Sequence, residues 1–339
     1  MATTAFDKPF KTYDEMIKIM RERNIEIVDE SLAKMVLENY SYYSIVNGYK
    51  NTFLQPDDSE KFIPGTRFEE LYTLHLIDTN LNNILFKYIL YIEKTLKSRL
   101  SYLVSENFGV YSDRADLSNN NPADYLYNRN YSNSNKKRDP ILRKVKACLQ
   151  NERKNPSLEH YINTKNHIPP WILTYNVPFG LSIEWYSILP GTHKTTICTK
   201  FINTPLLNID EHKEFFSKAL DLIKEYRNKI AHGNRTFSIM QLPVLPKKAI
   251  LTLSLGNLSV DEYNTQKLGQ NDVFAVFLVI MLLLNDQYLL TNFYNDCLNL
   301  FLPYKSQGVK FNGKSVFEVF GLPDNILDRM QNLLTVRFT

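Results

Sequence analysis

The chain has 339 residues, of which 44% are hydrophobic and 13% aromatic, values typical of a packed globular protein and not of a disordered one. Its 11 glycines are too few for a glycine-rich phosphate loop or a turn-dense β-sandwich to be favoured. The 40 Lys and Arg residues exceed the 36 Asp and Glu only slightly, so net charge by itself does not indicate a polyanionic partner.

Cysteine usage and apolar runs indicate an intracellular protein. Cys148, Cys198 and Cys297 lie far apart and form no C-x-x-C pair, a pattern that favours reduced thiols and no zinc site. The N-terminal stretch MATTAFDKPFK has no apolar core, so no signal peptide is expected. The longest apolar run, residues 273–284, is too short to span a bilayer and is typical of a buried core helix. We therefore expect a cytoplasmic protein that does not contact the membrane.

Helical periodicity dominates the N-terminal part of the chain. Residues 13–24 show the pattern of a short amphipathic helix, and a second helix is predicted from a cap at Asp29 or Ser31 to Gly48. From about 66 to 109 apolar residues recur every three or four positions without an intervening proline, which predicts one long helix.

The rest of the chain alternates between polar and apolar segments. Residues 112–135 are crowded with Asn, Ser and Asp and are predicted to form a long polar loop. The segment 136–154 then holds eight Lys and Arg against two acids, and this local excess of six is larger than the excess of four of the whole chain. Residues 210–232 and the very apolar 272–302 are each predicted to form a helix, and the alternation over 249–263 favours a short strand or hairpin.

These patterns predict a mainly α protein, a helical bundle with appended N-terminal helices, a long polar loop and a small β element. We assign 1–65 to an N-terminal helical region. Residues 66–302 form the bundle, with 112–155 as an inserted loop and basic segment, and 303–339 form a C-terminal extension.

The stretch EYRNKIAHGNR, residues 225–235, gathers polar side chains near the predicted end of helix 210–232. Asn228 and His232 are four residues apart and share one stripe of that helix, together with Asp221 and Glu225. Arg227 projects about 140° away from His232, but its long side chain can swing toward a substrate held over the stripe. If Gly233 ends the helix in a left-handed conformation, His232 lies in the last turn.

These three residue types suit the cleavage of RNA, whose 2′-hydroxyl is an internal nucleophile. His232 can act as general base or acid, and Arg227 can bind the phosphoryl oxygens in the transition state. Asn228 can orient the histidine or the phosphate. No metal or other cofactor is required, and the sequence offers no convincing metal-binding cluster. The competing interpretation is an ordinary histidine at a helix end, because an Arg and a His five residues apart often occur by chance.

The stretch RNKIAHGNR resembles the R-N-x-x-x-H form of the R-x4-6-H motif of HEPN-domain ribonucleases. Three further stretches, KPFKTYDEMIKIMRERNIEI, LENYSYYSIVNGYKNTF and YIEKTLKSRLSYLVSENFG, resemble segments of one branch, the AbiD/AbiF-like abortive-infection proteins or Abi_2 family. The resemblance covers roughly residues 8–235. The sequence departs from the family pattern at Met16, Asn24, Ser44 and Lys97, and none of these departures touches Arg227, Asn228 or His232.

The resemblance implies a HEPN-type helical bundle that works as a homodimer, with two R-x4-6-H helices forming one composite ribonuclease site. It implies phage defence by metal-independent RNA cleavage, giving a 2′,3′-cyclic phosphate and a 5′-hydroxyl, with toxin–antitoxin behaviour and a restraining non-coding RNA. Glu93, which is spaced for an ordinary intrahelical pair with Lys97, would on this reading orient Arg227 or Asn228. The alternatives are a HEPN protein that binds RNA without cutting it, and a toxin restrained by a protein.

Candidate RNA-binding residues come from the basic segment and the tyrosine-rich loop before it, because cations and stacking surfaces together suit single-stranded RNA. They are Lys136, Lys137, Arg138, Arg143, Lys144, Lys146, Tyr125, Tyr127 and Tyr131. A solvated helix face is the alternative interpretation of the charge run. No DNA partner is expected.

Overall fold

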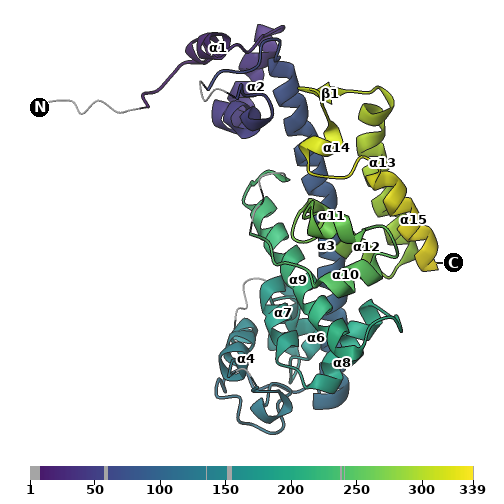
Figure 1. Cartoon of the computed structure of the whole chain (residues 1–339). Helices are drawn as coiled ribbons and strands as arrows, with labels where there is room; N and C mark the ends of the chain where they lie inside the picture. The colour runs from purple at the N-terminus through teal and green to yellow at the C-terminus, as the bar shows by residue number, and fades with distance from the viewer. Residues whose placement is uncertain are drawn as a thin grey trace, which may run out of the picture. The chain divides into compact units, whose positions relative to one another are not determined.

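The computed structural model describes residues 8–56, 60–134, 136–150, 155–236, 239 and 241–338, and this part of the chain is mainly helical (Figure 1). Within it, the strands β1 (Lys310–Phe311) and β2 (Lys314–Ser315) form one antiparallel pair. The predicted mainly α class, a helical bundle with a small β element, is confirmed. The β element, however, lies outside the segment for which it was predicted.

The chain folds into two compact units. Unit 1 contains the described residues up to Ile84, Arg235–Thr236 and Asn295–Ile326. Unit 2 contains the described residues of Leu85–Asn234, of Ile239–Tyr294 and from Leu327 on. The helices of unit 1 are α1 (Tyr13–Glu22), α2 (Glu30–Tyr42), the π-helix η1 (Tyr43–Asn47), η2 (Lys50–Thr52), the first part of α3 (Phe68–Phe108), the last part of α13 (Gln287–Ser306) and α14 (Val316–Val319).

Unit 2 is built almost entirely from helices around α9. Its elements are the rest of α3, η3 (Asn128–Asn130), α4 (Arg138–Ala147), η4 (Cys148–Gln150), α5 (Pro156–Thr164), α6 (Pro170–Leu173), α7 (Phe179–Ser187), α8 (Gly191–Phe201), α9 (Ile209–Ala231), α10 (Lys247–Leu253), α11 (Val260–Asn264), α12 (Val273–Leu283), the first part of α13 and α15 (Ile326–Phe338). Helix α9 packs against α7, α8, α10 and α12.

The two N-terminal helices begin at strong caps. At α1, Thr12 and Glu15 form a reciprocal capping box, and Ile17 and Met20 are buried. At α2, the Asp29 side chain accepts a hydrogen bond from the amide of Leu32, so Asp29 is the cap. Ser41 has a positive φ of 64°, which kinks α2 before the chain continues as the π-helix η1.

Helix α3 is one uninterrupted helix of 41 residues, as its apolar period predicted (Figure 1). Gly109 follows it with a φ of +90°, a left-handed conformation that L residues rarely adopt. The nine apolar residues that define the period are all buried, namely Leu71, Leu74, Leu81, Leu85, Tyr88, Ile92, Leu96, Leu100 and Leu103.

The strand or hairpin predicted over 249–263 is wrong, because this segment forms α10 and α11. Ala249, Ile250 and Leu253 are buried together at helical spacing, which orients one face of α10 toward the core. At α11, the side chain of Ser259 accepts from the amide of Glu262 and the Glu262 carboxylate accepts in return. Helical packing and this capping box outweigh the short alternation of apolar residues.

The single helix predicted over 272–302 is also wrong, since α12 and α13 are separated by residues 284–286. Leu284 is extended, and the Asp286 carboxylate accepts from the amide of Leu289 as a new cap. All residues of α12 are buried, so the apolar run is a core helix as predicted. No helix in the described ranges has the length and apolar character that a membrane span requires.

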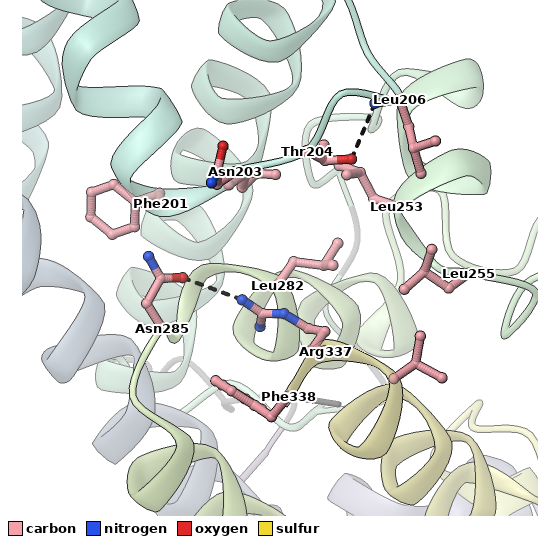
Figure 2. A pocket seen from close by; sticks show the side chains of 12 residues that line it. Phe201, Asn203, Thr204, Leu206, Leu253, Leu255, Leu282, Asn285, Arg337 and Phe338 are labelled. Carbon is pink, nitrogen blue, oxygen red and sulfur yellow. Dashed lines mark hydrogen bonds between the residues drawn. The ribbon is translucent and has the colours of Figure 1, made fainter.

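The break after α12 is stabilised by Arg337 of α15 (Figure 2). Its guanidinium donates to the carbonyls of Met281 and Leu284, the latter at 3.1 Å, and to the side-chain oxygen of Asn285 at 3.2 Å. These carbonyls lie at the helix end, where the backbone supplies no partner. Burial lowers the pKa of Arg337 to about 10.

Replacing Arg337 with Gln is therefore expected to lower the free energy of unfolding by about 1.5–3 kcal/mol, because buried carbonyls lose a charged donor. Urea unfolding measures the loss. The control is Arg143→Gln, an exposed arginine of α4, which should change the value by no more than about 0.5 kcal/mol. Equal losses in both variants would contradict the capping role.

Candidate active site

We call residues 227–232 the R-x4-H stretch, and helix α9 positions its arginine and histidine. The N-terminus of α9 is firmly capped. The Asn208 side chain accepts from the amides of Asp210 and Glu211, both at 3.0 Å, and the Glu211 carboxylate accepts from the amide of Asn208. One face of the helix is buried, formed by His212, Phe215, Phe216, Ala219, Leu220, Leu222, Ile223 and Tyr226. The side chains of Asp221, Glu225, Asn228 and His232 are not buried, so the predicted polar stripe faces away from the core.

The C-terminal end of α9 is a Schellman motif. Gly233 has a φ of +78°, its amide donates to the Ile230 carbonyl at 3.0 Å, and the amide of Asn234 donates to the Lys229 carbonyl at 3.1 Å. The predicted left-handed glycine is thus confirmed. His232 is the residue that ends the helix, and its side chain is exposed.

Arg227 lies one and a half turns earlier and is half-buried. Its guanidinium carbon lies 5.5 Å from the centre of the Phe86 ring, and Nη1 donates to the Asn228 side-chain oxygen at 3.3 Å. The Nε atom of Arg227 is buried and has no hydrogen-bond partner among the described residues. A buried donor without an acceptor is costly, and an anion that reached it would satisfy it.

A single chain does not bring Arg227 and His232 together. No hydrogen bond joins them in the described ranges, and five residues of helix separate them by about 7.5 Å along the axis. Asn228, in contrast, contacts Arg227 directly.

The orienting contact predicted for Glu93 is absent from the described part of one chain. Glu93 is buried and pairs with Lys97 at 2.7 Å, and its Oε2 has no partner there. The physical reason is its position on α3, because Glu93 lies two turns, about 10 Å, beyond the Phe86 ring that Arg227 covers.

Arg235, three residues after His232, is fixed within unit 1. Its Nη2 donates to the carbonyls of Ser44 at 3.1 Å and Tyr43 at 3.4 Å. The guanidinium also lies 5.5 Å from the ring centre of Tyr49 and occupies the space above Gly48. We did not predict this role from the sequence, where the only signal is a second arginine three residues after His232.

The next residue, Thr236, is fixed on α3. Its amide donates to Asp78 at 2.9 Å and its hydroxyl to Asn82 at 2.8 Å. Asp78 also accepts from the Tyr49 hydroxyl at 3.0 Å. Burial raises the pKa of Asp78, although the hydrogen bonds from Thr236 and Tyr49 oppose that shift. The chain is therefore held tightly in unit 1 immediately after the candidate site.

Replacing Gly48 with Ala is expected to destabilise the protein by about 0.5–1.5 kcal/mol in urea unfolding. A Cβ on Gly48 would overlap the Arg235 guanidinium and force it off the Tyr43 and Ser44 carbonyls. Gly48 has helical dihedral angles, so without this overlap alanine would be stabilising. Gly191→Ala in α8 is the matched control, because a Cβ there meets nothing within 4 Å. Stabilisation by both substitutions would contradict the clamp.

Six of the predicted RNA-binding residues are accessible. Lys136, Lys137, Arg143 and Lys144 are exposed, and Arg138 and Tyr127 are half-buried. Lys144 pairs with Glu184 of α7 at 3.1 Å, and Arg138 with Asp139 at 2.7 Å.

The predicted polar loop contains η3 as its one helical turn among residues 112–134. Residues 135 and 151–154 of the predicted loop and basic segment lie outside the described ranges.

The other three predicted RNA-binding residues, Lys146, Tyr125 and Tyr131, are corrected by the structure, since their side chains lie in the core. Lys146 continues the buried stripe of α4 and forms an ion pair with Asp124. The Tyr125 hydroxyl donates to the Ile168 carbonyl at 3.2 Å, and the Tyr131 hydroxyl donates to the Tyr125 carbonyl at 3.0 Å. These groups hold the polar loop to unit 2 and offer no surface to RNA.

No group of three His, Cys, Asp or Glu side chains in the described ranges is arranged to hold a metal ion.

A family model described as Abi-like protein matches residues 35–238, a range that includes α3, α9 and the R-x4-H stretch. No curated protein and no solved structure matches the chain.

Proposed function

The chain belongs to the Abi-like protein family, and on that premise we propose that it is a metal-independent endoribonuclease that acts in abortive infection as a defence against phage. The observation that carries the proposal is the end of α9. There the exposed His232 lies five residues after Arg227, which is the R-x4-H spacing. The Nε of Arg227 is buried and has no acceptor among the described residues.

The reaction needs a proton acceptor, a proton donor and a cation at one phosphate. The 2′-hydroxyl loses its proton to a base while its oxygen attacks phosphorus, and the bond from phosphorus to the 5′-oxygen breaks. That oxygen receives a proton from an acid, and the products are a 2′,3′-cyclic phosphate and a 5′-hydroxyl. His232 can serve as acid or base, and Arg227, supported by Asn228, can bind the phosphoryl oxygens.

A homodimer of HEPN type completes the proposal. In one chain Arg227 and His232 project about 140° apart around α9 and do not touch. Two copies of α9 packed around one phosphate would supply an arginine from one copy and a histidine from the other. The histidine of the first copy would be the second imidazole, so that one imidazole could accept a proton while the other donates one. Such an activity would be toxic to the cell, and a bound non-coding RNA would restrain it.

The test is native purification followed by RNA extraction, and then incubation of the RNA-free protein with labelled RNA in EDTA. We expect cleavage that leaves a 2′,3′-cyclic phosphate and is abolished at a position carrying a 2′-deoxy sugar. A discrete co-purifying RNA with no cleavage of any substrate would instead support a non-catalytic RNA-binding protein. Cleavage that needs a divalent metal would contradict the proposed chemistry.

A further inference from the structure

A groove of about 450 Å³ lies among α4, α7 and α9 in unit 2. Three lysines line it, Lys137 and Lys144 from the α4 side and Lys224 from α9, and we call it the lysine groove. Helix α7 packs against both α4 and α9 (Figure 1), and Gly180, Ile183 and Glu184 of α7 line the groove. The groove therefore combines Lys137 and Lys144 of the basic segment with Lys224 of α9, the helix that carries the candidate active site.

Two isoleucines and Gly180 line the lysine groove beside its charged and polar residues. Ile141 and Ile183 contribute buried side chains there, and Gly180 has none. The Lys224 stem would lie 3.5 Å from a Cβ on Gly180, so this lysine extends past Gly180 rather than into open solvent. Ammonium groups along a groove suit the phosphates of a single-stranded nucleic acid, whose backbone such grooves follow.

Two of the groove's lysines, Lys144 and Lys224, are paired with acids. Lys144 pairs with Glu184 at 3.1 Å, and Lys224 pairs with Asp221 and Glu225, both at 3.2 Å. The Lys144 and Glu184 side chains are 60% and 45% exposed, and ion pairs that accessible contribute little to stability. Lys144 can thus turn from its carboxylate to a phosphate at small cost, while the acids limit how tightly the groove binds.

The lysine groove lies close to the candidate active site along α9. Lys224 precedes Asn228 by four residues and His232 by eight, which is about 6 Å and 12 Å along the helix axis. Asp221, at the edge of the groove, lies on the same polar stripe as Asn228 and His232.

We infer that the lysine groove binds the backbone of single-stranded RNA next to the phosphate held by Arg227 and His232. The inference rests on the proposed function for the location of the scissile phosphate. Lys137, Lys144 and Lys224 would contact a flanking phosphate of the same strand, and Glu184 would weaken that contact.

The test measures the affinity of the full-length His232→Ala protein for a fluorescent single-stranded RNA that it cannot cut, over a range of salt concentrations. Adding Lys144→Gln or Lys224→Gln is expected to weaken binding several-fold and to lower the slope of log affinity against log salt by about 0.7 each. Adding Glu184→Gln is expected to tighten binding.

The opposite signs separate RNA contact from a structural role, because Lys144→Gln and Glu184→Gln break the same ion pair. If that pair only stabilises the fold, both variants should shift binding in the same direction, and this result would overturn the inference. Lys248→Gln is the control, since Lys248 also forms an exposed pair, with Glu211, outside the groove. The thermal midpoints of all variants are compared to confirm equal folding.

The two proposals fail separately. Unchanged RNA affinity in the groove variants, with cyclic-phosphate cleavage by the wild-type protein, would overturn the groove and leave the ribonuclease intact. No cleavage by the wild-type protein, with opposite shifts for Lys144→Gln and Glu184→Gln, would support the groove and overturn the ribonuclease. Absence of RNA binding by the His232→Ala protein would overturn the groove.

Discussion

Replacing His232 with Ala is expected to lower the rate of RNA cleavage by about 10²–10⁴-fold, the usual contribution of a general acid or base. Stability should not change, because the hydrogen bonds that end α9 come from the backbone and the His232 side chain is exposed. Single-turnover cleavage of labelled RNA in EDTA measures the first effect, and urea unfolding measures the second.

Two further variants sharpen this prediction. His160→Ala removes another exposed histidine of unit 2 and should leave cleavage unchanged. Arg227→Lys keeps the charge but loses the planar fork of donors, so it should also cleave slowly. Full activity of the His232→Ala protein would contradict the proposed chemistry directly.

Mixing the two inactive proteins tests the composite site. A dimer of one His232→Ala chain and one Arg227→Ala chain retains an intact arginine on the first and an intact histidine on the second. If the shared site takes these residues from different chains, the mixture should recover part of the wild-type activity, but not all of it, because the second imidazole is missing. Recovery would not occur if both residues had to come from one chain.

Replacing Lys146 with Met is expected to have the largest effect on stability, a loss of about 3–5 kcal/mol in the free energy of unfolding. Lys146 and Asp124 are both completely buried and form an ion pair, so the variant leaves a buried carboxylate without its cation. Asp124 also accepts from the Ser112 hydroxyl at 2.9 Å and from the amides of Asp113 and Leu126. The loss should therefore loosen the whole polar loop.

The control is Lys144→Met on the same helix, since Lys144 is exposed and its ion pair with Glu184 should contribute no more than about 1 kcal/mol. Adding Asp124→Asn to Lys146→Met should restore part of the lost stability, because the buried charge is then gone while the side-chain oxygen remains. Equal losses for Lys144→Met and Lys146→Met would show that burial of the pair has no role.

The sequence by itself determined the first two helices, the long helix α3, helix α9 and the local geometry of the candidate site. The period of α3 and the left-handed Gly233 after His232 were correctly predicted, and of the two caps proposed for α2, Asp29 and Ser31, the structure has Asp29. Each depends on side chains and backbone groups within a few residues of one another, because helix faces and caps are set by contacts at three or four positions. The R-x4-H spacing is likewise a property of one helix.

Only the tertiary structure decided which polar residues face inward and how the apolar segments divide. Lys146 had the same sequence signature as the exposed Lys144, but its partner Asp124 lies 22 residues away in the loop. The position of the Arg235 side chain depends on carbonyls about 190 residues earlier in the chain. The break after α12 depends on Arg337 of the last helix. Burial of a charge or of a free carbonyl is tolerated only where such a distant partner compensates for lost hydration, and no local pattern specifies that partner.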